Sequence, residues 1–156
     1  MSIFYKFSCE KCGYEENISL GSGGYWYARV YPQIISSAID GEFGADIQKI
    51  FKEHHHSAVV YSKVLAECGN CGRYENVLDV AVYLPKDNGL TNEGKFLNRF
   101  NIEKNYNCVA KFEHKCNFCG GAVEIFNEDT FDVEKTTLQC PNCQSLMVGD
   151  FGGTWD

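Results

Sequence analysis

Four Cys-x-x-Cys pairs punctuate this chain and account for eight of its nine cysteines. Two intervening residues let both thiolates of a pair face one ion from a tight loop, and two such loops complete a tetrahedral shell of four sulfurs. The sequence therefore predicts two structural metal sites. The predicted metal ligands are Cys9, Cys12, Cys68, Cys71, Cys116, Cys119, Cys140 and Cys143.

Composition limits the class of protein. The chain has 156 residues, of which 44% are hydrophobic, enough for one medium domain or two small ones. Its net charge of −7 repels phosphate backbones and disfavours nucleic-acid binding. We expect no membrane span and no secretory signal, because no apolar run approaches about 20 residues and no basic segment precedes an apolar one. Paired cysteines without a signal favour a cytoplasmic, metal-binding protein over a disulfide-stapled one.

Strands flank the first two pairs. Residues 3–7 and 14–20 surround Cys9/Cys12, and residues 59–65 and 74–84 surround Cys68/Cys71, with apolar residues at alternate positions. This strand, knuckle, strand pattern is typical of a zinc ribbon. Between them, residues 32–56 carry apolar stripes at helical spacing, interrupted near residues 41–44. We expect two short helices or one kinked helix there, with Pro32 in a first turn.

The last third resembles a more compact ribbon. Strands are expected at residues 106–112, 122–126, 130–138 and 146–148, and residues 151–156 form a short tail. The third and fourth cysteine pairs are 20 residues apart, inside the spacing typical of a zinc site.

The choice of partners among the four pairs follows from loop length. Joining first with second and third with fourth closes the shortest loops and costs the least chain entropy. The predicted fold is α+β with small antiparallel sheets, arranged as two zinc ribbons of which the first has a helical insertion. The expected domains are a zinc-ribbon domain at 1–85 with inserted helices at 32–56, a linker at 86–105, and a C-terminal zinc ribbon at 106–156.

Two resemblances arise at these residues. The fragments 9–14 and 140–143 look like the knuckles of rubredoxins, which bind iron through four thiolates; we interpret this as shared knuckle geometry. More broadly, residues 1–85 resemble a group of uncharacterised bacterial zinc-ribbon proteins, which implies a small cytoplasmic zinc protein and no particular activity. The matching segments are Cys9–Tyr14, Leu20–Gly23, Tyr31–Pro32, Asp40–Gly44, Cys68–Gly72 and Tyr83–Pro85.

Two further features are candidates for function. His54, His55 and His56 form a speculative second-metal site, although neighbouring helix residues diverge by about 100° and cannot all face one ion. Cys108 is left outside the four pairs, and we interpret it as a small buried residue of a strand.

Closed sites of four cysteines leave no position for substrate or activated water, so the sequence favours a non-catalytic zinc protein that binds a protein partner as an adaptor. Three alternatives remain open: a nucleic-acid-binding ribbon, a rubredoxin-like iron carrier of electrons, and an enzyme or metal-handling protein with an open site at the histidines, Glu53 and Asp46. For nucleic acid, the residues that could stack on bases or contact phosphates are Lys11, Arg73, Lys115, Tyr14, Tyr74 and Phe118.

Overall fold

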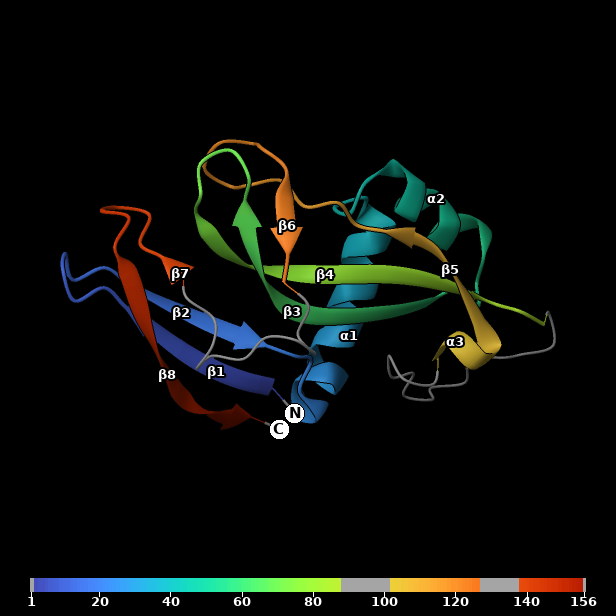
Figure 1. Cartoon of the computed structure of the whole chain (residues 1–156). Coiled ribbons are helices and arrows are strands. Elements are labelled where there is room, and N and C mark those ends of the chain that lie inside the picture. The colour runs from blue at the N-terminus through green and yellow to red at the C-terminus, as the bar shows by residue number, and fades with distance from the viewer. Residues whose placement is uncertain (1, 88–101, 127–137, 156) are drawn as a thin grey trace. The chain divides into compact units, whose positions relative to one another are not determined.

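The computed structural model describes residues 2–87, 102–126 and 138–155, with the side chains of residues 24–28 and 155 left aside. It contains two four-stranded antiparallel sheets and three helices in these ranges (Figure 1). The predicted α+β class with small antiparallel sheets is confirmed. No helix among the described residues is long and apolar enough to cross a membrane.

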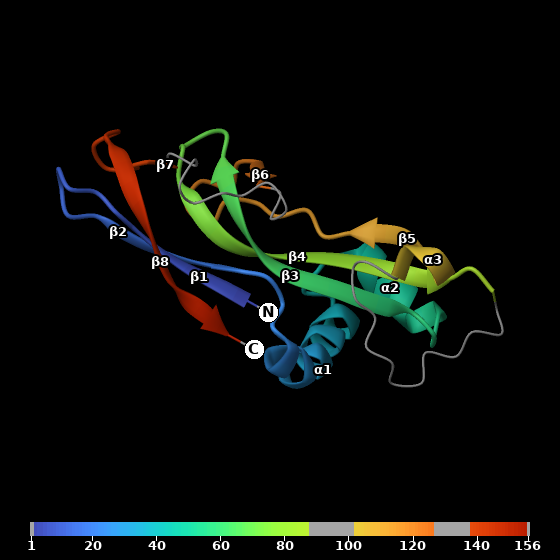
Figure 2. The ribbon, with the colours of Figure 1, turned by 60° about the horizontal axis from the view of Figure 1, so that its bottom comes forward.

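The first sheet joins the two ends of the chain. Its order is β2 (Glu15–Leu20), β1 (Ser2–Ser8), β8 (Leu146–Trp155) and β7 (Leu138–Gln139). Figure 1 and Figure 2 show β1, β2 and β8 side by side. β1 and β8 are antiparallel along their length, with a register shift between Phe4 and Tyr5. The residues predicted as a tail, 151–155, belong to β8.

The second sheet has the order β5 (Tyr106–Lys111), β4 (Tyr74–Pro85), β3 (Ala58–Cys68) and β6 (Val123–Ile125). Most residues of β3 and β4 are buried, in keeping with their β-branched and aromatic composition. The strands predicted around the first three cysteine pairs are thus confirmed to within a few residues. Of the strand predicted at 130–138, all but Leu138 lies outside the described residues.

The helices are α1 (Gly24–Asp40), α2 (Ala45–Glu53) and α3 (Ile102–Asn105). The predicted break falls where expected, because Gly41 and Gly44 have φ values of 88° and 94° that favour glycine. The predicted start at residue 32 is wrong: α1 begins eight residues earlier, and Pro32 lies inside the helix rather than in its first turn.

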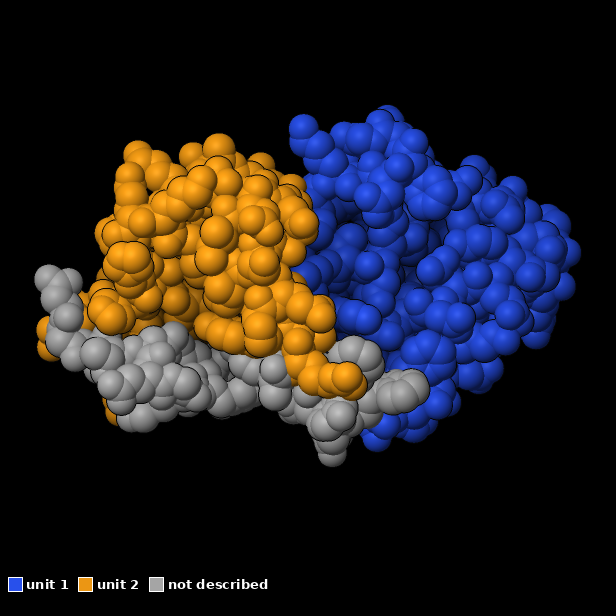
Figure 3. Space-filling view, turned by 180° about the vertical axis from the view of Figure 1, so that it is seen from behind, with its two compact units in different colours: residues 1–24, 62–78, 114–156 blue, residues 25–61, 79–113 orange. Residues whose placement is uncertain are grey.

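The structure divides into two compact units (Figure 3). Unit 1 comprises residues 1–24, 62–78 and 114–156, and unit 2 comprises residues 25–61 and 79–113. Both are discontinuous in the sequence, unlike the consecutive domains expected from the cysteine spacing, because β3 and β4 each contribute residues to both. Most of the expected linker, residues 88–101, lies outside the described residues; its end forms α3.

Each unit has its own core. In unit 1, side chains of β1, β2, β7 and β8 pack with Leu65 and Tyr74, and Phe7 and Ile18 are fully buried. In unit 2, Tyr83 and Ala58 pack with Tyr106 and Ile102. Four of the predicted metal ligands, Cys9, Cys68, Cys116 and Cys140, are buried as deeply as these core residues.

Candidate metal centres

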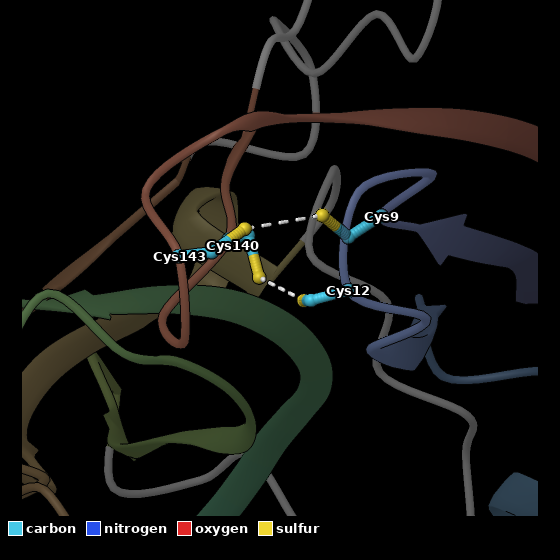
Figure 4. A group of neighbouring side chains, drawn as sticks. All are labelled: Cys9, Cys12, Cys140 and Cys143. Atoms are coloured by element: carbon cyan, nitrogen blue, oxygen red, sulfur yellow. Dashed lines mark hydrogen bonds between the residues drawn. The ribbon is translucent and has the colours of Figure 1, made fainter.

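The structure assembles the eight cysteines into two groups of four, both within unit 1. The outer tetrad joins the first and last pairs in the sequence, Cys9/Cys12 and Cys140/Cys143 (Figure 4). The inner tetrad joins the middle pairs, Cys68/Cys71 and Cys116/Cys119. The predicted joining of neighbouring pairs is therefore wrong, and the two groups are nested in the sequence.

The prediction failed because the cost in loop-closure entropy differs little between the nested and the neighbour pairing. The observed groups link residues 128 and 45 positions apart. Because each doubling of a loop costs only about 0.6 kcal/mol, nesting costs about 1.4 kcal/mol more chain entropy than neighbour pairing. Fully burying one large apolar side chain such as Phe7, which β1 presents to the unit 1 core, gives back about 1.5–3 kcal/mol.

The sulfur separations fit a tetrahedral metal site. Cys9 and Cys143 have their sulfurs 3.5 Å apart, and Cys12 and Cys140 also 3.5 Å. In the inner tetrad the corresponding separations are 3.5 and 3.6 Å. A tetrahedron with metal–sulfur bonds of about 2.3 Å has edges of about 3.8 Å, whereas a disulfide bond is about 2.05 Å long. Both groups therefore suit a metal ion, and none of the nine cysteines forms a disulfide bond.

All four Cys-x-x-Cys loops share one backbone conformation. In each, the N–H of the first cysteine donates to the carbonyl five residues later, and the N–H four residues later donates back to that cysteine's carbonyl, at 2.8–2.9 Å. The residue four positions after the first cysteine always has positive φ. It is Gly13 (72°), Gly72 (66°), Gly120 (70°) and, at the fourth loop, Gln144 (59°).

This conformation divides the ligands by burial. The first cysteine of each pair is 1–3% exposed, whereas the second is exposed or half-buried. One edge of each tetrad is therefore anchored in the core of unit 1, and the other faces outward. Four protein sulfurs fill a four-coordinate site, so neither centre leaves a position at which a metal could bind substrate or water.

Close packing surrounds the inner tetrad. A Cβ added at Gly121 would lie 2.9 Å from the Asn70 Cβ and 3.3 Å from the sulfurs of Cys119 and Cys68, so this position requires glycine. The Asn70 Nδ2 donates to the Cys119 sulfur at 3.5 Å. Together with the backbone N–H of Gly121 and the neighbouring thiol of Cys68, this bond lowers the pKa of Cys119 to about 6.

The outer tetrad has a corresponding donor. The hydroxyl and the backbone N–H of Ser145 stabilise the Cys143 thiolate and lower its pKa to about 6. A hydrogen bond to the Glu75 carboxylate acts in the opposite direction at the inner tetrad, where with burial it raises the pKa of Cys116 to about 12. Metal binding requires the thiolate form, and in each tetrad the lowered pKa of one ligand favours that form.

Two consecutive residues of β4 link the tetrads to the strands behind them. The Tyr74 hydroxyl accepts a hydrogen bond from the N–H of Gln139, the residue before Cys140. The Glu75 carboxylate accepts hydrogen bonds from Asn117, the residue after Cys116. The sequence analysis did not identify Glu75 or Asn117 and considered Tyr74 only as a possible stacking surface. The alternation of Leu78, Val80 and Val82 puts Glu75 on the opposite face of the strand, so no sequence pattern indicated its burial.

The remaining candidate residues lie elsewhere. His54, His55 and His56 are exposed at the end of α2, and in the described part of the chain they join no group of metal-ligating side chains. Cys108 is exposed on β5, so its interpretation as a buried residue is wrong. Its strand pairs with β4 at one edge of the second sheet, which leaves the side chain open to solvent.

The residues proposed to stack on bases are also separated by burial. Phe118 is 64% exposed and lies under the Arg73 guanidinium, whose carbon is 4.1 Å from the ring centre. Tyr74 is buried, and the half-buried Tyr14 donates its hydroxyl proton to Glu16 at 2.6 Å. Only one of the three aromatic rings is thus widely open to solvent.

Comparisons of this chain with protein-family models, with curated proteins and with solved structures found no match. We therefore infer function from the geometry of the two tetrads.

Proposed function

We propose that this protein is a non-catalytic zinc protein in which two structural centres, each of four cysteines, stabilise unit 1. The observation that supports this proposal most directly is the pair of closed sulfur tetrads, each with its first cysteines buried in the unit 1 core. A centre filled by four thiolates holds a metal without an open coordination position, which is characteristic of structural zinc.

The test is metal analysis of the protein purified from its native cells, combined with unfolding in the presence of a strong chelator. We expect two zinc ions per chain and no colour. We also expect chelation to unfold unit 1, because structural zinc contributes about 10–16 kcal/mol of apparent binding free energy at neutral pH. Iron at these sites, seen as a red protein that bleaches on reduction, would contradict the zinc assignment and favour an electron carrier.

The proposed role is that of an adaptor for a protein partner. Large apolar side chains are exposed on unit 1: Phe118 is 64% exposed, Leu146 61% and Phe151 62%. Exposed aromatic and aliphatic groups of this size are typical of protein-binding surfaces when they lie together. Leu146 and Val148, two residues apart on β8 and both exposed, share one face of the first sheet.

Affinity capture from native extract tests the adaptor role. The zinc-loaded protein should retain a specific protein, and a variant with Leu146→Ser and Val148→Ser should lose it while still binding two metals. Because these side chains are exposed, both substitutions should leave the fold intact. Recovery of nucleic acid instead, released by moderate salt, would contradict the adaptor role and favour the nucleic-acid alternative.

A further inference from the structure

Tyr74 and Glu75 occupy a distinctive position between the two tetrads. They begin β4, three and four residues after Cys71. Since successive side chains of a strand point to opposite faces, consecutive residues can reach two different places. Tyr74 contacts the loop of the outer tetrad at Gln139, and Glu75 contacts the loop of the inner tetrad at Asn117.

Glu75 is an acidic side chain in an unusual environment, because only 7% of it is exposed. It accepts the backbone N–H of Asn117 at 3.0 and 3.2 Å and the Asn117 side-chain amide at 2.6 Å. A buried carboxylate costs several kcal/mol unless hydrogen bonds compensate it, and Asn117 supplies two donors, of which the backbone N–H is shared by both carboxylate oxygens. The N–H of Asn117 takes no part in the shared loop conformation, so this contact orients the Cys116 loop from outside.

Tyr74 has the corresponding place at the outer tetrad. It is 8% exposed and packs in the same core cluster as Cys9 and Cys140. Its hydroxyl accepts the N–H of Gln139 at 3.2 Å. The ring therefore sets the position of the backbone that leads directly into Cys140.

We propose that Tyr74 and Glu75 are positioning residues for the two metal centres: Tyr74 orients Cys140 in the outer tetrad, and Glu75 orients Cys116 in the inner tetrad. This inference rests on the proposed metal binding. Outer contacts of this kind hold ligands in their bound direction before the metal enters, which raises affinity by reducing the ordering that binding requires.

The full-length protein loaded with cadmium provides a test for each centre separately. Cadmium NMR gives one resonance for each four-sulfur site, and a Cys12→Ser variant assigns the resonance of the outer centre. Metal release into excess chelator is then followed for both resonances. Glu75→Gln keeps the size of the side chain but places an amide donor against the donors of Asn117, and Tyr74→Phe removes only the hydroxyl.

We expect Glu75→Gln to accelerate release from the inner centre by about 10- to 100-fold and to leave the outer centre unchanged, because the lost orientation of the Cys116 loop outweighs the removal of a carboxylate charge beside the Cys116 sulfur. Tyr74→Phe should accelerate release from the outer centre and leave the inner centre unchanged. Matched controls are Glu124→Gln, an exposed residue of β6, and Tyr106→Phe, a buried tyrosine of the unit 2 core; both rates should stay at their original values.

Unchanged release in both variants, or equal acceleration at both centres in either one, would overturn the inference, since equal acceleration indicates a general loss of stability. If Glu75→Gln does not fold, Asn117→Ala tests the same contact from its exposed end and should accelerate only the inner centre. The measurement uses cadmium, so it is independent of the native metal. If each variant accelerates release from only its own centre but the native metal is iron, the positioning roles of Tyr74 and Glu75 stand and the zinc proposal fails. If the native metal is zinc but the variants accelerate both centres equally, the zinc proposal stands and the positioning roles fail.

Discussion

The nested pairing of the tetrads leads to a prediction opposite to the one that neighbour pairing makes. Two double variants distinguish them: Cys12→Ser with Cys143→Ser, and Cys12→Ser with Cys71→Ser. All three residues are exposed or half-buried, so serine disturbs little of the core. In the structure the first variant damages only the outer tetrad, whereas the second removes one ligand from each.

The expected magnitude is a difference of one tightly bound metal per chain. The first variant should retain one, at the inner tetrad, and the second should retain none. An intact centre is worth about 10–16 kcal/mol of apparent binding free energy, comparable with the whole stability of a typical domain at about 5–15 kcal/mol. The second variant should therefore also unfold at much lower denaturant concentration than the first.

The assay is metal content by elemental analysis after dialysis against a competing chelator, with the unsubstituted protein as reference. Urea unfolding followed by circular dichroism reports the stability of the same samples. One metal retained by Cys12→Ser with Cys71→Ser, and none by Cys12→Ser with Cys143→Ser, would refute the nested arrangement and restore the pairing of neighbours.

Further predictions concern the loops and the histidines. Gly121→Ala should cost about 1–3 kcal/mol of unfolding free energy and weaken metal binding at the inner centre, because the added Cβ meets two sulfurs. Gly69→Ala is the control and should cost much less, because a Cβ at Gly69 has no heavy atom within 4 Å. Gln144→Gly should be neutral or slightly stabilising in urea unfolding, because relief of about 1–2 kcal/mol of left-handed strain outweighs the extra chain entropy of glycine. Gly72→Ala, at the equivalent position of another loop, should lose about 1 kcal/mol. Replacing His54–His56 by alanine should leave the metal content unchanged, and loss of a metal would show that these exposed residues are ligands after all.

Local features of this structure were predictable from the sequence. Each Cys-x-x-Cys loop determines its own conformation through short-range hydrogen bonds, and Gly13, Gly72 and Gly120 stand where that conformation needs positive φ. Alternating apolar residues placed most of the strands, and Gly41 with Gly44 placed the break between helices. All of these depend on neighbours within a few residues.

The long-range arrangement was not predictable in the same way. Loop entropy distinguishes the two pairings by only about 1.4 kcal/mol, while the contacts that decide between them join residues far apart in the sequence. The antiparallel pairing of Phe7 with Gly149 is one example, and the bond from Gln139 to Tyr74 is another. Nothing in the spacing of the cysteines reports these contacts.

The nested arrangement also sets an order for folding during synthesis. Cys12 and its partner Cys140 are 128 residues apart, so at about 5–20 residues per second the ribosome needs about 6–26 seconds to make the second after the first. Over that interval Cys9 and Cys12 have only each other as ligands, while Cys68, Cys71, Cys116 and Cys119 can already close the inner site. The nascent chain can therefore complete the inner centre first, whereas Cys9 and Cys12 after β1 lack half of their ligand set until Cys140 and Cys143 have been synthesised.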